Sequence, residues 1–320
     1  MRNAIILPWL DVENANAVAG LTWGFPAITH FLGYMHALSR KLEVSHGLRL
    51  EACGVICHRY QLHAYSSGRD YQFALTRNPL TREGKTASFN EEGRMHLTVS
   101  LVMECHGDIA NGDIGMHELA QHLQTLCQMQ KLAGGTITSL RTVQVCTLSQ
   151  VKSMLFGLMP GFALHDRSSW LAEHFTEIKR HDPEREMLDA WLDFAGLKMA
   201  AAQNTQGEDR VAWHYQPKPK PGFLVPLMIG WQRISPLYEA GAVLHTRDRD
   251  TPFSFAEAVY GIGEWRGVHR IKNIDELLWR YHTTENGYYC RNHNLSDNDD
   301  NKENYFDTFK GLKHGKNVCY

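Results

Sequence analysis

Apolar and polar positions change their period close to the start of the chain. Residues 4–10, AIILPWL, form an apolar run that predicts a buried strand. The apolar side chains of residues 28–38 recur at intervals of three and four, which predicts a helix with one buried face. Between them, residues 23–26 (WGFP) combine aromatic rings with glycine and proline and predict a bend. The first unit is therefore strand, turn and helix.

The turn before this helix is a candidate binding site. Unpaired backbone N–H groups at a helix start attract phosphate, and Trp23 offers a face on which a base can stack. The alternative is that Trp23 and Phe25 simply fill the core. The local pattern leaves both possibilities open.

Two further strands enclose a long insertion. Residues 48–60 are rich in apolar side chains and predict a strand that ends in CHRY. Residues 94–105 alternate strictly between apolar and polar, as in a half-buried strand. The insertion between them, residues 63–92, is polar and rich in turn residues.

A second helix follows the insertion. Apolar side chains of residues 116–127 repeat at helical spacing, and Gly134 with Gly135 is a plausible left-handed stop. A last strand is expected within residues 136–145 or in the PGFAL segment at 160–164. The order strand, helix, strand, insertion, strand, helix, strand predicts an α+β fold of the split βαβ or ferredoxin-like type.

That fold leaves one face of the sheet free, and many readers of single-stranded RNA use this face. His96, Thr98 and Ser100 lie on the polar side of the strand at 94–105 and are candidates there. A merely solvated face is the commoner explanation for such a pattern.

The remaining chain changes composition several times. A helix is expected within residues 274–281, and the residues after 290 are too polar to bury much surface. The predicted parts are a palm at 1–165 with its insertion at about 63–92, a helical segment at 166–202, an extended linker at 203–221, a C-terminal part completing the core at 222–290 and a polar tail at 291–320.

Composition narrows the function classes. The 33 Lys and Arg residues nearly balance 35 Asp and Glu residues, so a basic site must be local rather than global. Seven scattered cysteines favour reduced thiols in a cytoplasmic protein over a disulfide framework. The first residues lack a signal-peptide pattern, and no run approaches the roughly 20 apolar residues that span a bilayer.

Motifs for metal and nucleophilic chemistry are weak. His117 and His122 are five residues apart, about 140° around a helix, so they do not form the i, i+4 pair of a zinc protease. Cys53, Cys57 and His58 have no second ligand pair at zinc spacing. The sequence has neither a G-x-S-x-G elbow nor a P-loop. We therefore predict no metal, no cofactor and no catalytic residues.

The insertion is different, because its cations lie among aromatic residues. Arg77, Arg82 and Lys85 lie between Phe73 and Phe89 in the sequence. This mixture suits the binding of phosphates and unstacked bases. A solvated hairpin is the alternative. Farther along, the RDRD segment at 247–250 can equally be an internal salt-bridge network.

A series of short segments, taken in order, resembles the Cas-five-type (Csy) subunit of type I-F CRISPR Cascade surveillance complexes, which holds the 5′ handle of the guide RNA. Each segment is weak alone, but together they cover most of the chain. They are NAN at 14–16, LTWGFP at 21–26, VICHR at 55–59, LTRNPL at 75–80, EEGR at 91–94, HGD at 106–108, LAGG at 132–135, LMPGFAL at 158–164, SPLY at 235–238, RDRDTP at 247–252, GIGEW at 261–265 and HR at 269–270.

The resemblance implies a palm like an RNA-recognition motif with a β-hairpin thumb, and a C-terminal extension packed on it. It implies a non-catalytic RNA-binding subunit that caps the crRNA 5′ handle as a heterodimer with the large subunit, next to the backbone subunits, and supports binding of target double-stranded DNA. No membrane is involved. The expected RNA-binding residues are Trp23, Gly24, Phe25, Pro26, His58, Arg59, Thr76, Arg77, Asn78, Arg82, Lys85, Arg94, His96, Arg247 and Arg249.

Two alternatives remain. Some relatives in other CRISPR types cut guide precursors, so a metal-independent endoribonuclease is one, with His58 or His96 as a possible base. A protein-only scaffold that never touches RNA is the other. The linker at 203–221 and the tail depart from the expected pattern, and no function is carried over to either.

Overall fold

The structure, a computed structural model, describes residues 2–68, 70–203 and 211–292. It divides into two compact units, each considered by itself. The larger comprises Met1–Leu164, Met228–Val259 and Arg266–Asn294, and the smaller comprises His165–Leu227, Tyr260–Trp265 and Leu295–Tyr320. The fold is mixed α and β, with a large antiparallel sheet and several helices.

The sheet of the larger unit is centred on three long antiparallel strands. They are β1 (Arg2–Asn16), β4 (Arg49–Leu62) and β8 (Arg94–His106), with β8 between the other two. Shorter strands extend the sheet: β12 (Phe162–Asp166) beside β4, both β11 (Gln144–Thr147) and β10 (Gly135–Ser139) beside β1, and β9 (Lys131–Leu132) beside β10. The strands expected at 4–10, 48–60 and 94–105 are confirmed.

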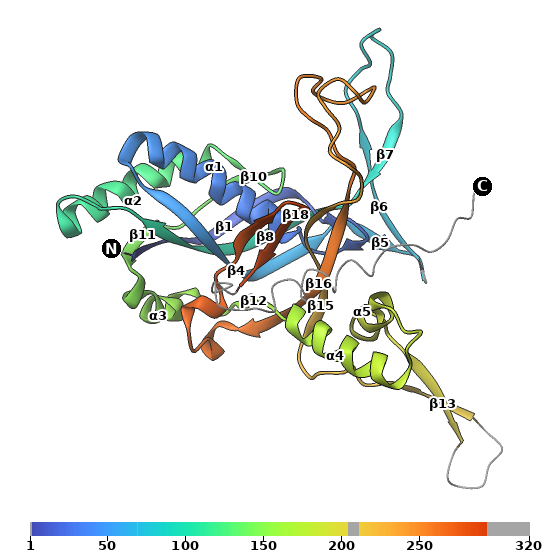
Figure 1. Ribbon diagram of the computed structural model, residues 1–320. Coiled ribbons are helices and arrows are strands. Elements are labelled where there is room, and N and C mark those ends of the chain that lie inside the picture. Colours follow the sequence, from blue (N-terminus) through green and yellow to red (C-terminus); the bar gives the residue numbers. More distant parts are fainter. Residues whose placement is uncertain (1, 69, 204–210, 293–320) are drawn as a thin grey trace. The chain divides into compact units, whose positions relative to one another are not determined.

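Two helices cover one face of this sheet (Figure 1). Helix α1 (Ile28–His46) buries Phe31 and Leu32, and it ends at Gly47, whose φ of 66° is left-handed. Helix α2 (Gly112–Gln128) is tied to α1 because Tyr34 Oη donates to Cys127 O at 3.1 Å. Both helices were predicted from the periodicity.

The opposite face of the sheet is covered over most of its length. Because side chains alternate along a strand, Ala4 and Ile6 of β1 lie on this face, in one buried cluster with Val102 of β8. The covering elements are α3 (Val151–Met154), η2 (Leu155–Leu158), η3 (Val268–Arg270) and η4 (Ile274–Glu276). The prediction of a free face is therefore wrong for this stretch.

Strand β8 shows where the cover begins. Its polar-side residues are half-buried at His96 and Thr98, but Ser100 is buried and so is Glu104. At the far end, Glu104 accepts from Arg2 and from Arg280, each at 2.5 Å. The strand is half-buried only at its start, because chain from beyond residue 150 packs over the rest.

Three strands form the insertion between β4 and β8. They are β5 (Ala64–Ser66), β6 (Tyr71–Arg77) and β7 (Phe89–Glu92), paired in sequence order. This three-stranded projection is called the hairpin below. A shorter ribbon, β2 (Val18–Ala19) with β3 (Thr22–Trp23), precedes α1. The insertion expected at 63–92 contains these three antiparallel strands.

In the C-terminal part of the larger unit, the structure corrects the helix predicted at residues 274–281. Strand β18 (Gly287–Arg291) pairs with β15 (Leu224–Arg233) and with β17 (Arg280–Thr284). Only Ile274–Glu276 of the helix expected at 274–281 is helical. The backbone of Trp279 instead exchanges two hydrogen bonds with Cys53, which requires an extended chain there.

A second correction concerns the end of α2. The helix stops at Gln128 with Met129 at its C-terminal cap, before the two glycines expected to end it. Gly134 lies in the turn between β9 and β10, where its φ is 75°, and Gly135 opens β10. The two glycines therefore form the turn between two strands, since α2 has already ended at Gln128.

The smaller unit holds two helices and a strand pair. Helices α4 (Ser168–His181) and α5 (Met187–Ala195) pack together, and β13 (Met199–Gln203) pairs with β14 (Val211–Tyr215). Strand β14 lies in the segment expected to be an extended linker, and Met199 belongs to a strand rather than a helix. The remaining strand, β16 (Ala256–Gly267), has residues in both units, as do β12 and β15.

Parts of two expected segments, residues 204–210 of the linker and 293–320 of the tail, lie outside the described residues. Within the described ranges, no helix has the length and apolarity to cross a bilayer.

Candidate nucleic-acid interface

A row of polar side chains crosses the sheet where its cover ends. Arg59 of β4, Thr98 of β8, Asp11 of β1 and Ser139 of β10 occupy paired positions on four neighbouring strands. Thr98 Oγ1 donates to Asp11 Oδ1 at 2.6 Å, and Ser139 Oγ donates to Oδ2 at 2.5 Å. These four residues are called the polar row. They mark the open end of the second sheet face.

The Asp11 carboxylate stays ionised in this setting. Partial burial raises its pKa, but the hydrogen bonds from Ser139 and Thr98 and the charges of Arg59 and Arg141 outweigh burial. The net pKa lies below the usual aspartate value. Arg59 of the row and nearby Arg141 are both exposed, so two guanidinium groups lie close to one fixed carboxylate.

A stack of three side chains separates the polar row from the apolar cluster. The Trp9 ring stacks on His58, with centroids 3.9 Å apart and planes at 12°, and the Arg141 guanidinium lies 4.3 Å from the Trp9 centroid. Trp9 has a φ of 53°, at a point where the pairing of β1 with β8 shifts register. The irregular backbone turns this ring onto the open side of the cluster.

Both nitrogens of His58 are occupied. Nδ1 lies 2.7 Å from Pro160 O, which can only accept, so Nδ1 carries the proton. Nε2 therefore accepts from Ser100 Oγ at 2.7 Å, and that hydroxyl oxygen accepts from Trp9 N–H at 2.9 Å. Burial, with the charges of Arg141 and Arg59, holds the pKa of His58 below its usual value. The ring is a neutral structural link.

The turn before α1 lies against the base of the hairpin. Trp23 is exposed over 42% of its surface, and its ring lies 5.3 Å from the rings of Tyr71 and Phe73 of β6. Phe25 instead stacks on buried Phe31 at 5.6 Å, and Pro26 is buried. Gly24, with a φ of 115°, provides the bend. Trp23 is thus the accessible residue of the turn, while Phe25 and Pro26 pack inward.

The hairpin carries exposed cations. Arg77 lies 5.2 Å from the Phe89 ring across the β6–β7 pair, and Arg82 and Lys85 follow in the loop. Thr76 is half-buried, and Asn78 Nδ2 donates to Ser88 O at 3.3 Å. Among the described residues, no carboxylate pairs with Arg77, Arg82 or Lys85. Their charges remain available to an anionic ligand.

Arg94 and His96 serve the junction between hairpin and sheet. Arg94 pairs with Glu92 at 2.6 Å and donates to Asn14 O at 3.3 Å. His96 Nδ1 accepts from Asn14 N–H at 3.2 Å, and its ring meets His63 edge-on at 4.2 Å. Desolvation, followed by the charge of His96, lowers the pKa of His63. Arg94 is therefore neutralised by Glu92, and both side chains are half-buried and engaged at this junction.

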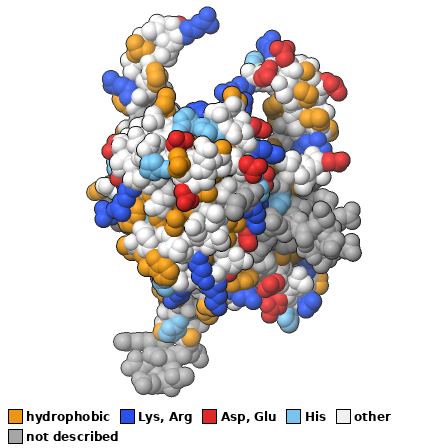
Figure 2. Space-filling model, turned by 90° about the vertical axis from the view of Figure 1, so that its left-hand side faces the viewer, with side chains coloured by type: hydrophobic (Ala, Val, Ile, Leu, Met, Phe, Trp, Pro, Cys, Tyr) orange, Lys and Arg blue, Asp and Glu red, His pale blue; other side chains and the backbone are white. Residues whose placement is uncertain are grey.

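Arg247 and Arg249 lie on the long loop between β15 and β16. The sequence left open whether they form an internal salt-bridge network with Asp248 and Asp250. Asp248 instead accepts from Asp250 N–H at 2.9 Å and from Thr251 Oγ1 at 2.6 Å. In the described part of the chain, neither arginine forms an ion pair. In Figure 1 this loop and the hairpin extend beyond the same end of the larger unit, and Figure 2 shows them as separate projections with basic side chains near their ends.

The structure thus brings the expected site residues into three groups. Arg59 belongs to the polar row, with His58 before it on β4 and His96 before Thr98 on β8. Trp23 joins the hairpin residues, and Arg247 and Arg249 lie on a separate loop. Sequence reasoning missed Trp9, Asp11 and Arg141. The only signal in the sequence was the polar side of β8, which lies on the same face of the sheet as these residues.

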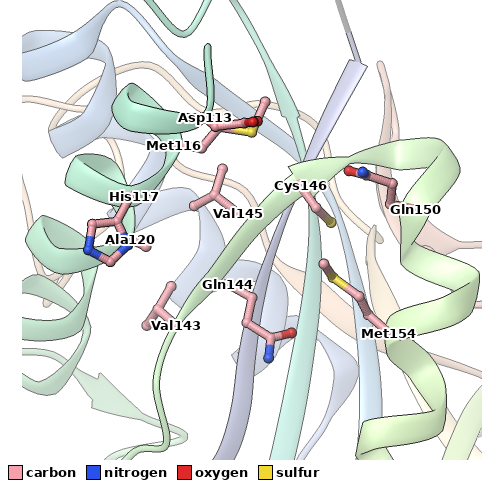
Figure 3. Close-up of a pocket in the computed structure, with 10 residues that line it drawn as sticks. All are labelled: Asp113, Met116, His117, Ala120, Val143, Gln144, Val145, Cys146, Gln150 and Met154. Carbon is pink, nitrogen blue, oxygen red and sulfur yellow. The ribbon is translucent and has the colours of Figure 1, made fainter. Parts of the chain in front are cut away.

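A groove lies elsewhere in the larger unit, between α2 and β11 (Figure 3). It is lined by Met116 and His117 of α2, Val145 and Cys146 of β11, and Met154 of α3. None of the expected site residues lines it. Its walls are polar and apolar in similar measure and include neither Lys nor Arg, so they lack the convergent cations of a nucleic-acid site.

The thiols and carboxylates assemble no metal site within the described residues: no three His, Cys, Asp or Glu side chains gather in a suitable geometry. The six described cysteines are buried, and none of them forms a disulfide with another. Burial raises the pKa of Cys57 to about 12 and that of Cys105 to about 11. Such thiols are poor metal ligands and poor nucleophiles.

Comparison with known proteins gives a consistent result. The family model for the CRISPR-associated protein Cas_Csy2 matches residues 5–290. The CRISPR-associated protein Csy2 of Pseudomonas aeruginosa (strain UCBPP-PA14) is 37% identical over 300 residues, which cover 87% of this chain and 91% of that relative. The family match includes the polar row and the hairpin.

Proposed function

The chain belongs to the Csy2 family of CRISPR-associated proteins, and from this premise we propose that it is an RNA-binding subunit of a type I-F surveillance complex. In this proposal it caps the 5′ handle of the guide RNA as a heterodimer with the large subunit. It adjoins the backbone subunits and supports binding of target double-stranded DNA.

The sheet topology supports an RRM-like palm with an inserted thumb. The elements β1, α1, β4, β8, α2 and β11 follow one another in the order of a split βαβ fold. The sheet order β4-β8-β1-β11 brings the first and third of these strands together, with the hairpin inserted between β4 and β8. Readers of single-stranded RNA use the exposed face of such sheets, and the polar row occupies its open end.

The observation that carries the proposal is the contact between Trp23 and the base of the cationic hairpin. An exposed ring can stack on an unpaired base, and the nearby cations can neutralise its phosphates. Arg77, Arg82 and Lys85 have no described carboxylate partners. Arg59 and Arg141 extend the basic surface to the polar row.

The near-neutral composition fits a subunit of an assembly better than a solitary nucleic-acid binder. A basic patch confined to one end of a sheet needs neighbouring subunits to lengthen the RNA path. The large subunit and the backbone subunits supply that continuation in this proposal.

A non-catalytic role is favoured over an endoribonuclease. Both ring nitrogens of His58 are engaged, with Pro160 O and with Ser100 Oγ, so the ring has no free nitrogen to accept a proton from RNA. Incubation with full-length precursor RNA in EDTA separates the two functions. Specific cleavage abolished by His58→Ala would establish the enzyme instead.

The handle-binding proposal is tested with the purified heterodimer of this chain and the large subunit. Trp23→Ala combined with Arg77→Ala should weaken binding of handle-bearing RNA about tenfold or more, since both a stacking and a phosphate contact are lost. Filter binding over a series of salt concentrations measures this. Lys179→Ala on α4 of the smaller unit is the control and should change nothing.

Unchanged RNA binding by the Trp23 and Arg77 double variant would remove this site. Crosslinking of guide RNA in the assembled complex tests the remaining alternative, a scaffold that never touches RNA. A complete lack of crosslinks to residues 2–145 would favour the scaffold.

A further inference from the structure

The β13–β14 ribbon of the smaller unit has one apolar, aromatic face. Met199 is paired with Tyr215, and Ala201 with Trp213. Directly paired residues point to the same side of an antiparallel ribbon, and alternate residues share that side. Met199, Val211, Trp213 and Tyr215 therefore form a single surface, called the aromatic face below.

This face is uncovered within the described residues. Trp213 is 65% exposed and Tyr215 71%, and Met199 and Val211 are about half exposed. No described element other than its partner strand makes extensive contact with either strand, and Figure 1 shows the ribbon extending away from α4 and α5 of the same unit. The other side of the ribbon carries Ala200, Ala202, Ala212 and His214.

An isolated two-stranded ribbon is marginally stable in water. Large apolar side chains on one side of it stay in contact with water until another surface covers them, so they contribute no burial energy on their own. Contiguous exposed apolar surface of this kind marks interaction sites. The arrangement is therefore that of a docking element rather than of a solvated loop.

The charges around the ribbon decide which partner it suits. Lys198 is paired with Asp193, Lys220 with Glu173 at 3.4 Å, and Lys218 Nζ donates to Leu224 O at 3.2 Å. Each described lysine flanking the ribbon is thus engaged within the unit. Nucleic-acid binding needs cations free to neutralise phosphate, whereas Trp, Tyr and Met are enriched in the buried cores of protein interfaces.

We propose that the aromatic face docks into an apolar groove on a different protein subunit of the surveillance complex. The inference rests on the proposed function only in taking this chain as one subunit of a multi-protein assembly. The face needs no RNA contact, and its apolar character predicts an association that salt hardly weakens.

The test uses the complex assembled from all its subunits and guide RNA. Trp213→Ser with Tyr215→Ser should weaken incorporation of this chain about 30-fold or more, as expected for loss of interface hot spots. His214→Ser, on the opposite side of the same ribbon, is the matched control and should incorporate normally. Thermal unfolding of each isolated variant should match the parent, because neither ring lies in a core.

A photocrosslinking residue in place of Tyr215 identifies what covers the face. Crosslinks to a different protein subunit support the proposal. Crosslinks to guide RNA or to a second copy of this chain overturn it, as does normal incorporation of the double variant at both low and high salt. Handle-RNA binding, measured in parallel, reports on the proposed function separately.

Discussion

The hairpin of the larger unit and the ribbon of the smaller unit are the same kind of element with opposite side-chain chemistry. Both are short antiparallel projections that carry exposed aromatic rings. On the hairpin, Arg77 and its neighbouring cations have no carboxylate partners among the described residues; on the ribbon, the flanking lysines are engaged. In our two proposals, local charge compensation rather than backbone shape separates the RNA-binding surface from the protein-binding surface.

Removing the hairpin cations should have the largest effect, a loss of RNA affinity. Arg77→Ala, Arg82→Ala and Lys85→Ala together should weaken handle-RNA binding roughly 100-fold near physiological salt and reduce the salt slope by about one per cation. Filter binding with the heterodimer measures both quantities. Lys179→Ala with Arg180→Ala on α4 is the control, and equal losses in the two variants would break the contrast.

The ring beneath Arg77 should have a smaller effect. Phe89→Leu keeps an apolar side chain but removes the ring that lies 5.2 Å from the guanidinium. We expect RNA affinity to fall about two- to fivefold, because a cation–π contact at an exposed site contributes roughly 0.5–1 kcal/mol. Tyr65→Leu, at another exposed ring of the hairpin, should leave affinity unchanged. If the two variants behave alike, Phe89 does not position Arg77.

Lowering the pH should produce the smallest effect, a loss of folding stability through His58 in the sheet that bears the hairpin. The pKa of His58 is lowered in the folded protein, so the unfolded chain binds a proton first as pH falls. The stability linked to this ring is complete above its ordinary pKa of 6.5 and is lost below it. Between pH 7.5 and 5.5 the free energy of unfolding should therefore decrease, by less than about 1 kcal/mol for this half-buried group.

Urea unfolding at the two pH values measures this loss, and His58→Gln should reduce it. His214→Gln on the ribbon should leave the pH dependence as in the parent. A steeper decrease in the His58 variant than in the parent would mean that the imidazole is stabilised by protonation, contrary to its contacts with Pro160 and Ser100.

Long periodic elements were predictable because their pattern spans many residues. The buried faces of α1 and α2 and the alternation of β8 each follow from local sequence, as does the polar character of the hairpin. The helix expected at 274–281 failed because a tertiary pairing of Trp279 with Cys53 overrides local preference. The supposed free sheet face failed for a related reason, since its cover comes from residues far along the chain.

The candidate site was only partly predictable on the same grounds. Cations within the hairpin are close in sequence, so a local reading finds them. The polar row joins Asp11, Arg59, Thr98 and Ser139 through strand register, which composition does not encode. The stack of Trp9 between His58 and Arg141 depends in addition on an irregular backbone.

Strands β4 and β8 are paired right up to the base of the hairpin. Leu62 already pairs with Met95, and His63 N–H donates to Arg94 O at 2.9 Å, so β4 and β8 meet before the hairpin begins. The sheet register is closed beneath the insertion. Chain can therefore be gained or lost beyond this point without moving β4 or β8, so the reach of the hairpin can change while the sheet stays the same.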